Sequence, residues 1–192
     1  MTKTEIVCVI DNSGSMGLIK SDAIGGFNQF IKTQRELEGE ATVSIYLFNR
    51  KTTQIANCMD INDVELLTDK TYTTSGSTAM NDALGQSMDE VGQRILKTKA
   101  KDRPDKVIFC VLTDGEENSS IEYSLVQVKD QIRHRQTNFD WEFVFLAANQ
   151  DALETAKDYS FSPKSSFNFE ATQEGVRGAY DQMSSYVTSV RS

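Results

Sequence analysis

The 192-residue sequence predicts an α/β fold in which helices cover both faces of a mostly parallel central sheet. Two continuous apolar runs, at residues 6–10 and 107–112, are typical of strands that are buried on both faces. Segments with helical spacing alternate with strand-like segments to the end of the chain. The sequence contains no repeat or linker, which favours a single domain over residues 1–192.

The N-terminal part begins with a strand, a helix and a pair of strands. The strand at 6–10 ends at Asp11, and a helix is expected at 18–37. Two adjacent glycines, Gly25 and Gly26, weaken this helix locally but permit close packing on a sheet. Strands at 43–48 and 52–59 are separated by three residues, which is short enough for a hairpin, so we expect this pair to be antiparallel.

A polar loop rich in Thr, Ser and Gly at 68–78 leads into the next helix. The apolar positions of that helix are spaced by three or four residues, at Met80, Leu84, Met88, Val91 and Ile95. A basic segment at 97–106 then connects the helix to the strand at 107–112. We interpret this segment as a solvated surface connection.

The last third of the chain adds two strands and three helices. The first helix is predicted from apolar residues at helical spacing, namely Ile121, Leu125, Val128 and Ile132. A strand follows at 141–148, a short helix at 152–159 and an edge strand at 165–169. The final helix presents an apolar stripe of Val176, Tyr180, Met183, Val187 and Val190.

The composition argues against two classes of partner. Lys and Arg number 20 and Asp and Glu 28, so the net charge is −8 and the isoelectric point is about 4.7. Nucleic acids and anionic membrane surfaces both attract basic proteins, so we expect neither as a partner. The longest apolar runs contain six residues, as at 107–112, which is too short to span a membrane.

The N-terminus and the cysteines favour a cytoplasmic location. The first residues place Glu5 ahead of a short apolar run and do not resemble a signal peptide. Cys8, Cys58 and Cys110 lie in apolar, strand-like runs and lack C-x-x-C spacing. This pattern is typical of reduced thiols in a protein core.

Residues with oxygen donors follow two of the predicted strands, where ligands of open α/β sheets usually bind. Asp-Asn-Ser-Gly-Ser occupies 11–15, Thr-Asp-Gly occupies 113–115, and the polar loop ends at Thr78. The candidate metal ligands are the carboxylates and hydroxyls of Asp11, Ser13, Ser15, Thr78 and Asp114. Such hard oxygen ligands suit Mg²⁺, whereas the lack of His and Cys makes zinc and copper poor candidates.

Several neighbours compete with this set or extend it. Thr74, Ser75 and Ser77 are rivals of Thr78, and the Thr78 hydroxyl could instead cap the following helix. Three residues are candidates for a rim around the metal, with Met16 forming an apolar ledge beside Ser77 and Glu116. Glu116 and Glu117 could alternatively be first-turn acids stabilised by the N-terminus of the next helix.

The combination of Asp-x-Ser-x-Ser after a buried first strand, a distant Thr and a later Thr-Asp-Gly resembles the von Willebrand factor A domain. That family uses this pattern as a metal-ion-dependent adhesion site, and five residues match it: Asp11, Ser13, Ser15, Thr78 and Asp114. The resemblance covers nearly the whole chain. It implies a three-layer, Rossmann-like sandwich with one antiparallel edge strand.

The resemblance also implies a protein-interaction module rather than an enzyme. In the family, an Asp or Glu from a partner protein completes the coordination of the cation, which is Mg²⁺ with Mn²⁺ or Ca²⁺ as alternatives. The expected intracellular location points to the stand-alone microbial or phage type. Members of this type work alone or beside ATPases or chelatases, so an ATPase- or chelatase-like assembly is one expected partner.

The alternative is a haloacid-dehalogenase-like phosphatase or phosphotransferase with Asp11 as its nucleophile. Those enzymes place a second Asp two residues later as acid/base, a role worth about 10² to 10⁴ in rate, and here Ser13 stands there. The single histidine, His134, lies between two arginines at the polar end of a predicted helix. This position favours a surface histidine over a member of a catalytic triad.

Overall fold

The computed structural model describes residues 2–148 and 152–192 and places six strands in one sheet. The strands are β1 (Lys3–Asp11), β2 (Glu40–Phe48), β3 (Thr52–Asp60), β4 (Lys106–Thr113), β5 (Glu142–Ala148) and β6 (Ser166–Phe169). Their order is β3-β2-β1-β4-β5-β6, with every neighbouring pair parallel except the antiparallel pair of β2 and the edge strand β3. This confirms the predicted sheet.

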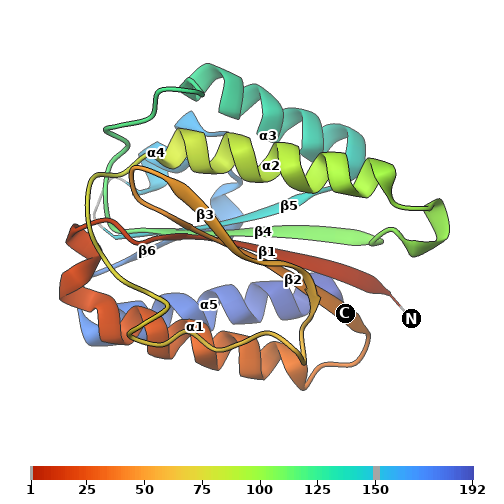
Figure 1. Cartoon of the computed structure of the whole chain (residues 1–192), viewed down its shortest axis with the longest axis horizontal. Coiled ribbons are helices and arrows are strands. Elements are labelled where there is room, and N and C mark those ends of the chain that lie inside the picture. Colours follow the sequence, from red (N-terminus) through yellow and green to blue (C-terminus); the bar gives the residue numbers. More distant parts are fainter. Residues whose placement is uncertain (1, 149–151) are drawn as a thin grey trace.

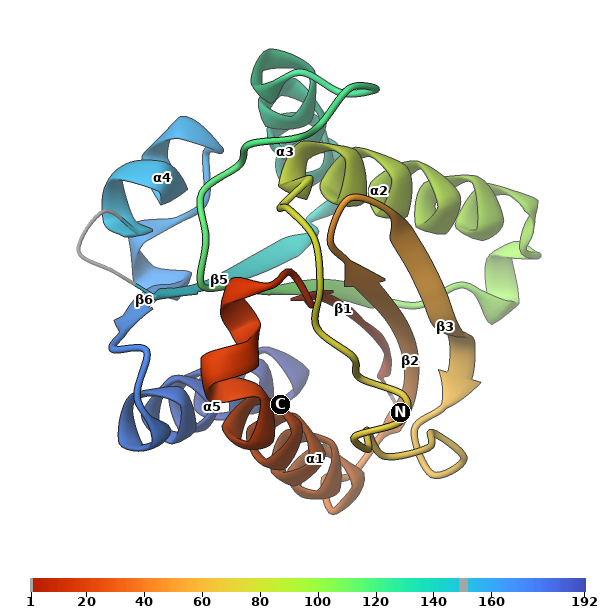
Figure 2. The ribbon, with the colours of Figure 1, turned by 60° about the vertical axis from the view of Figure 1, so that its left-hand side comes forward.

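Helices cover both faces of the sheet, as predicted (Figure 1). They are α1 (Lys20–Arg35), α2 (Met80–Lys97), α3 (Leu125–Phe139), α4 (Ala152–Asp158) and α5 (Gln173–Arg191). The described residues also form three short 3₁₀ turns, which are η1 (Ser15–Ile19), η2 (Ala100–Asp102) and η3 (Pro163–Ser165). Figures 1 and 2 show α1 and α5 on one face of the sheet and α2, α3 and α4 on the other. No described helix has the length and apolar character that crossing a bilayer requires.

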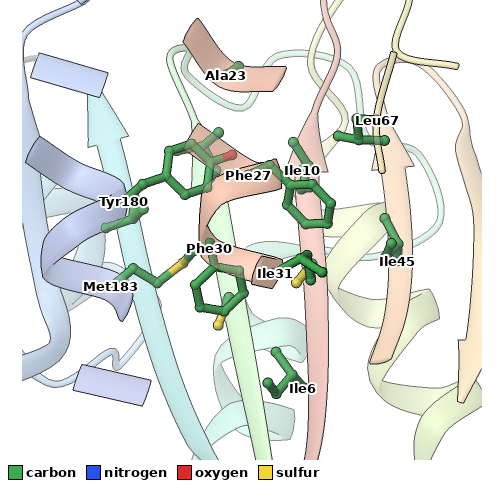
Figure 3. Close-up of a cluster of buried hydrophobic side chains, with 14 of the residues drawn as sticks. Ile6, Ile10, Ala23, Phe27, Phe30, Ile31, Ile45, Leu67, Tyr180 and Met183 are labelled. Atoms are coloured by element: carbon green, nitrogen blue, oxygen red, sulfur yellow. The ribbon is translucent and has the colours of Figure 1, made fainter. Parts of the chain in front are cut away.

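The alternation of side chains along β1 explains its continuous apolar sequence. Ile6 and Ile10 belong to the cluster that packs against α1 and α5, whereas Val7 and Val9 belong to the cluster beneath α2. Each strand residue therefore meets a helix on its own side, and no position of the run is left for a polar residue. Figure 3 shows the first of these clusters, with side chains of α1 and α5 meeting over the sheet.

Gly26 permits α1 and α5 to pack closely. A Cβ placed on Gly26 would lie 2.2 Å from Cδ2 of Tyr180, which is closer than real Cβ contacts allow. The neighbouring Gly25 is exposed, and a Cβ placed there meets nothing within 4 Å. The two glycines that weaken the helix thus have different roles, and only Gly26 is required by packing.

Residue 121 was wrongly predicted to belong to a helix. Ile121 is 91% exposed and lies before Ser124, the N-cap of α3. The Ser124 hydroxyl accepts a hydrogen bond from the Gln127 N–H, and the Gln127 side chain accepts one from the Ser124 N–H. This capping box begins the helix at Leu125, so the apolar spacing upstream of Ser124 is not part of it.

The prediction of three core cysteines holds for two of them. Cys8 and Cys110 are buried and face each other across the β1–β4 pair. Cys58 is only half-buried and has a φ of 49°, because it lies where the register of the β2–β3 pair is irregular. All three thiols are free.

An aromatic cluster lies where β5 begins, at the end of the sheet opposite the carboxyl ends of β1 and β4. The ring of Trp141 stacks on Phe109 with centroids 5.3 Å apart, and the Arg135 guanidinium lies 5.2 Å from the Trp141 ring centroid. His134 is exposed and contacts the edge of Phe139. The surface position expected for this histidine is therefore confirmed.

We expect Gly26→Ala and Gly25→Ala to change stability in opposite directions. Gly26→Ala forces a methyl group against the Tyr180 ring and should lower the free energy of unfolding by about 1–3 kcal/mol. Gly25→Ala meets open space at an exposed position of α1 and should raise the free energy of unfolding by about 0.5–1 kcal/mol. Urea denaturation of both variants measures the difference, and equal effects would contradict the proposed packing of α1 on α5.

Candidate metal centre

The parallel pairing of β1 with β4 brings two parts of the predicted site together. Ile10 lies opposite Leu112, so Asp11 and Thr113 leave the sheet side by side. The Thr113 hydroxyl donates a hydrogen bond of 2.6 Å to Asp11 Oδ2. This is the point at which the strand order reverses, and the loops after β1, before α2 and after β4 converge there (left-hand end of Figure 1).

Four of the five predicted ligands form a continuous hydrogen-bonded chain. Asp11 Oδ1 accepts a hydrogen bond of 2.7 Å from the Ser13 N–H. The hydroxyl oxygens of Ser13 and Ser15 lie 3.1 Å apart, and the Ser15 hydroxyl donates to Asp114 Oδ1 at 2.7 Å. The structure therefore brings Asp11, Ser13, Ser15 and Asp114 together, although Asp114 follows the first three by about one hundred residues.

The hydroxyl of Thr78 lies beside the same group of oxygens. A Cβ placed on Gly115 would lie 3.2 Å from Thr78 Oγ1 and 3.6 Å from Ser15 Oγ, so both hydroxyls lie close to Gly115. The N-cap of α2 is Ala79, and among the described residues the N–H groups of Asn81 and Asp82 donate to Glu117 and Ser120, so the Thr78 hydroxyl does not cap this helix. Thr74, one of the rivals, instead has its hydroxyl 3.3 Å from the position of a Cβ on Gly17.

Backbone hydrogen bonds join the loop before α2 to the loop that carries the serines. The Gly14 N–H donates to the Gly76 carbonyl, and the Ser75 N–H donates to the Asn12 carbonyl, both at 2.9 Å. A φ of 76° at Gly76, in the region that favours glycine, permits this approach. The two loops are therefore fixed relative to each other without any contribution from a metal.

The loop after β4 caps the N-terminus of α2. Glu117 accepts a hydrogen bond of 2.8 Å from the Asn81 N–H, and the Ser120 hydroxyl accepts one of 3.0 Å from the Asp82 N–H. In return, the Asp82 carboxylate accepts hydrogen bonds from the backbone N–H groups of Ile121, Glu122 and Tyr123. The alternative that Glu116 and Glu117 are first-turn acids of the next helix is therefore wrong, since α3 begins at Leu125 without an acid in its first turn and Glu117 instead binds the N-terminus of α2.

The three predicted rim residues differ in position. Met16 is fully buried in the core cluster under α1, because η1 turns its side chain inward with that of Ile19. The expected apolar ledge at Met16 is therefore absent from the surface. Ser77 is half-buried and Glu116 is exposed, and a role for either at the rim stays a prediction.

Sequence reasoning missed two residues that support the site. Thr113 donates a hydrogen bond to the Asp11 carboxylate. It belongs to the Thr-Asp-Gly pattern, of which only Asp114 was predicted to take part in the site. The hydroxyl of Tyr72, a fully buried residue, donates a hydrogen bond of 2.5 Å to the Asp11 carbonyl. No local pattern distinguishes this tyrosine, because its partner lies 61 residues away.

Burial controls the ionisation of the two carboxylates. Burial raises the pKa of Asp11, although hydrogen bonds from Thr113 and Ser13 act in the opposite direction and the negative charge of Asp114 adds to the increase. Burial also raises the pKa of Asp114, against the hydrogen bond from Ser15. A nearby cation would favour the charged form of both groups, and this donor set fits an oxygen-preferring divalent cation.

The donor set consists mainly of hydroxyls. Within residues 2–148 and 152–192, no group of three or more His, Cys, Asp or Glu side chains could hold a metal ion. The candidate centre has only two carboxylates, accompanied by the hydroxyls of Ser13, Ser15 and Thr78. Two carboxylates balance the charge of one divalent ion and the three hydroxyls are neutral, so a further oxygen ligand could bind only at a coordination position that these residues leave open.

Solved structures with the same fold include a mussel byssus protein and a bacterial pilus tip protein. Proximal thread matrix protein 1 from the mussel byssus has a TM-score of 0.67 at 14% identity, and the match covers 97% of this chain and 46% of that protein. The von Willebrand factor domain of the type V pili tip protein Mfa5 from Porphyromonas gingivalis has a TM-score of 0.69 at 12% identity. The match covers 100% of this chain and 97% of that domain. Another structure of the mussel protein has zinc in its MIDAS motif, the abbreviation for the metal-ion-dependent adhesion site.

These likenesses show the fold, and the chain spans about half the length of the mussel protein. A pilus adhesin, SpaC from Lactobacillus rhamnosus GG, has a TM-score of 0.73 at 12% identity, with 100% of this chain and 30% of that chain covered. A comparison with curated proteins found no match. The sequence model of the von Willebrand factor type A domain family matches residues 5–182, so the chain belongs to this family.

Proposed function

We propose that the chain is a metal-dependent protein-interaction module that binds a carboxylate of a partner protein through a divalent cation. The convergence of Asp11, Ser13, Ser15 and Asp114 in one hydrogen-bonded chain carries this proposal. Thr78 is the fifth proposed ligand, because its hydroxyl lies on the same side of Gly115 as that of Ser15. The family assignment supports it, since the five residues match the metal-ion-dependent adhesion site.

The burial of these residues defines the side from which a partner approaches. Asp11 and Ser13 are buried, whereas Ser15 is exposed and Asp114 is half-buried. Asp11 and Ser13 would therefore support the ion from below, and Ser15 and Asp114 would hold it at the surface. A cation held by these residues would suit an Asp or Glu side chain of the partner at a coordination position that they leave open.

Mg²⁺ is the proposed ion, with Mn²⁺ and Ca²⁺ as alternatives, because every donor is a hard oxygen. The zinc described for the mussel protein shows that this motif can hold zinc in a relative, even though oxygen-only sites are unusual for zinc. Zinc therefore belongs among the ions to be compared. The choice of Mg²⁺ stays a prediction.

A non-catalytic role is favoured over that of a phosphatase. Asp11 is completely inaccessible, and both of its carboxylate oxygens accept hydrogen bonds, from the Ser13 N–H and from the Thr113 hydroxyl. A nucleophile must bond directly to its substrate and would have to leave both partners to do so, whereas a carboxylate can stabilise a nearby cation by its charge while it keeps them. Ser13 also occupies the place where the second Asp of such enzymes is required.

We further propose a cytoplasmic, stand-alone module of the microbial or phage type. The three free thiols support a reducing compartment. The net charge of −8 supports a protein partner over nucleic acid or an anionic membrane surface. An ATPase- or chelatase-like assembly is the proposed class of partner, and an Asp or Glu of that assembly would complete the site.

Substitutions of the ligands test the metal centre. We expect Asp11→Asn and Asp114→Ala to weaken Mg²⁺ binding by at least about tenfold in calorimetric titration, because each removes half of the negative charge of the site. Thr78→Ala should weaken binding less, and Thr74→Ala should serve as a control without effect. Unchanged affinity of the Asp11→Asn and Asp114→Ala variants would show that the cation binds elsewhere.

Metal binding should stabilise the folded chain. An ion that binds only the folded state at 100 times its dissociation constant adds about 2.7 kcal/mol, which corresponds to an increase of roughly 5–10 °C in Tm for a domain of this size. Thermal unfolding with Mg²⁺, Mn²⁺, Ca²⁺ and Zn²⁺ ranks the ions. An equal increase in Tm for the Asp114→Ala variant would argue against this site.

Chelation tests the proposed mode of partner binding. Partners isolated by affinity capture in Mg²⁺ should dissociate when EDTA is added, because their carboxylate binds through the ion. They should also be lost from the Asp114→Ala variant. A partner that remains bound under both conditions would contradict binding through a metal-bound carboxylate.

A further inference from the structure

A groove with a volume of about 840 Å³ lies beside the candidate metal centre. One wall comes from the β2–β3 hairpin and carries Arg50 and Lys51, and the other comes from the loop before α3 and carries Ile121. Ser75 and Gly76 also line it. The groove therefore shares its border with the loop that precedes Thr78.

The groove is joined to the metal centre through direct contacts. Ser75 and Gly76 are hydrogen-bonded to Asn12 and Gly14 of the loop at residues 12–15, here called the serine loop. A Cβ placed on Gly76 would lie 3.5 Å from Cγ and 3.6 Å from Cδ of Arg50. The methylene groups of Arg50 thus lie against the same short segment that is hydrogen-bonded to the loop carrying the serines.

The charges of the groove differ from the acidic balance of the whole chain. Arg50 and Lys51 are exposed, and neither takes part in an ion pair within the described part of the chain. The two acids that line the groove, Asp82 and Glu122, lie on α2 and on the loop before α3, away from the hairpin, and the Asp82 carboxylate accepts three backbone N–H hydrogen bonds. The groove as a whole is therefore charge-balanced, but its hairpin wall is basic and favours an acidic side chain of a ligand.

The second wall adds an apolar contact. Ile121 is 91% exposed, although the N–H groups of residues 121–123 are fixed by the Asp82 carboxylate. The loop already fixes the backbone of this exposed aliphatic side chain. An apolar side chain of a ligand could therefore pack on it with little further loss of conformational entropy.

We propose that this groove binds the continuation of the partner segment whose carboxylate reaches the metal. A second acidic residue of that segment would pair with Arg50 and Lys51, and an apolar residue would cover Ile121. The partner therefore presents an acidic linear segment with at least two carboxylates and one aliphatic or aromatic side chain. This inference rests on the proposed function, because the first carboxylate is the one bound through the cation.

Selection from a random phage-displayed peptide library tests the groove without knowledge of the partner. The selections use the wild-type chain in Mg²⁺, the same chain in EDTA, and the variant Arg50→Glu/Lys51→Glu in Mg²⁺. The matched control is Lys32→Glu/Arg177→Glu, which makes the same charge change at exposed positions on α1 and α5. Calorimetric titration with Mg²⁺ first confirms that both double variants keep the metal site.

We expect the wild type and the control to enrich peptides with two acidic residues and one apolar residue. Selection on the hairpin variant, Arg50→Glu/Lys51→Glu, should still need Mg²⁺. The peptides enriched on it should carry Lys or Arg in place of one of the two acidic residues. A synthetic peptide from the wild-type selection should bind the hairpin variant at least about tenfold more weakly in fluorescence anisotropy. Ile121→Ser should remove the preference for the apolar residue.

The two proposals fail in different ways. Enrichment that persists in EDTA or with Asp114→Ala would contradict binding through the metal, which is the proposed function itself. Equal affinity of the selected peptide for the wild type and the hairpin variant in Mg²⁺ would overturn only the groove. A wild-type selection that depends on Mg²⁺ but enriches peptides with a single acidic residue and no apolar preference would also overturn only the groove.

Discussion

The parallel register of β1 and β4 is the constraint on which the candidate metal centre depends. It places Asp11 beside Thr113 and allows the 2.6 Å hydrogen bond that holds the carboxylate. A shift of one residue in this pairing would turn the side chains of a whole strand to the other face, so two helix-covered cores oppose it. The core packing of both layers therefore determines the position of the carboxylate.

Three loops converge on this point, and each is anchored by contacts that do not involve a metal. Tyr72 holds the backbone of Asp11, and Gly76 is bonded to the serine loop. The reciprocal hydrogen bonds between the N-terminus of α2 and residues 117–123 hold the segment after Asp114. Ligands that are already in place lose little conformational freedom when an ion binds, which favours a small donor set rich in hydroxyls.

Local patterns were sufficient to predict the sheet and the five converging residues. The apolar runs at 6–10 and 107–112 specify strands, and the polar residues that end them are adjacent in sequence to those runs. Long-range contacts were not accessible in this way. The burial of Met16 depends on the direction of η1, and the partner of Glu117 is a helix that precedes it in the chain. Ile121 continues an apolar spacing that the Ser124 cap interrupts, and this placed it wrongly in α3.

The position of Trp141 has a practical consequence for spectroscopy. It is the single tryptophan of the chain, and it stacks on Phe109 at the amino-terminal edge of the sheet. The candidate metal centre lies at the carboxyl-terminal edge, beyond Asp11 and Thr113. We therefore expect intrinsic tryptophan emission to follow the loss of the aromatic cluster during unfolding and to change little with ion occupancy. The same natural fluorophore should then monitor denaturation across metal concentrations.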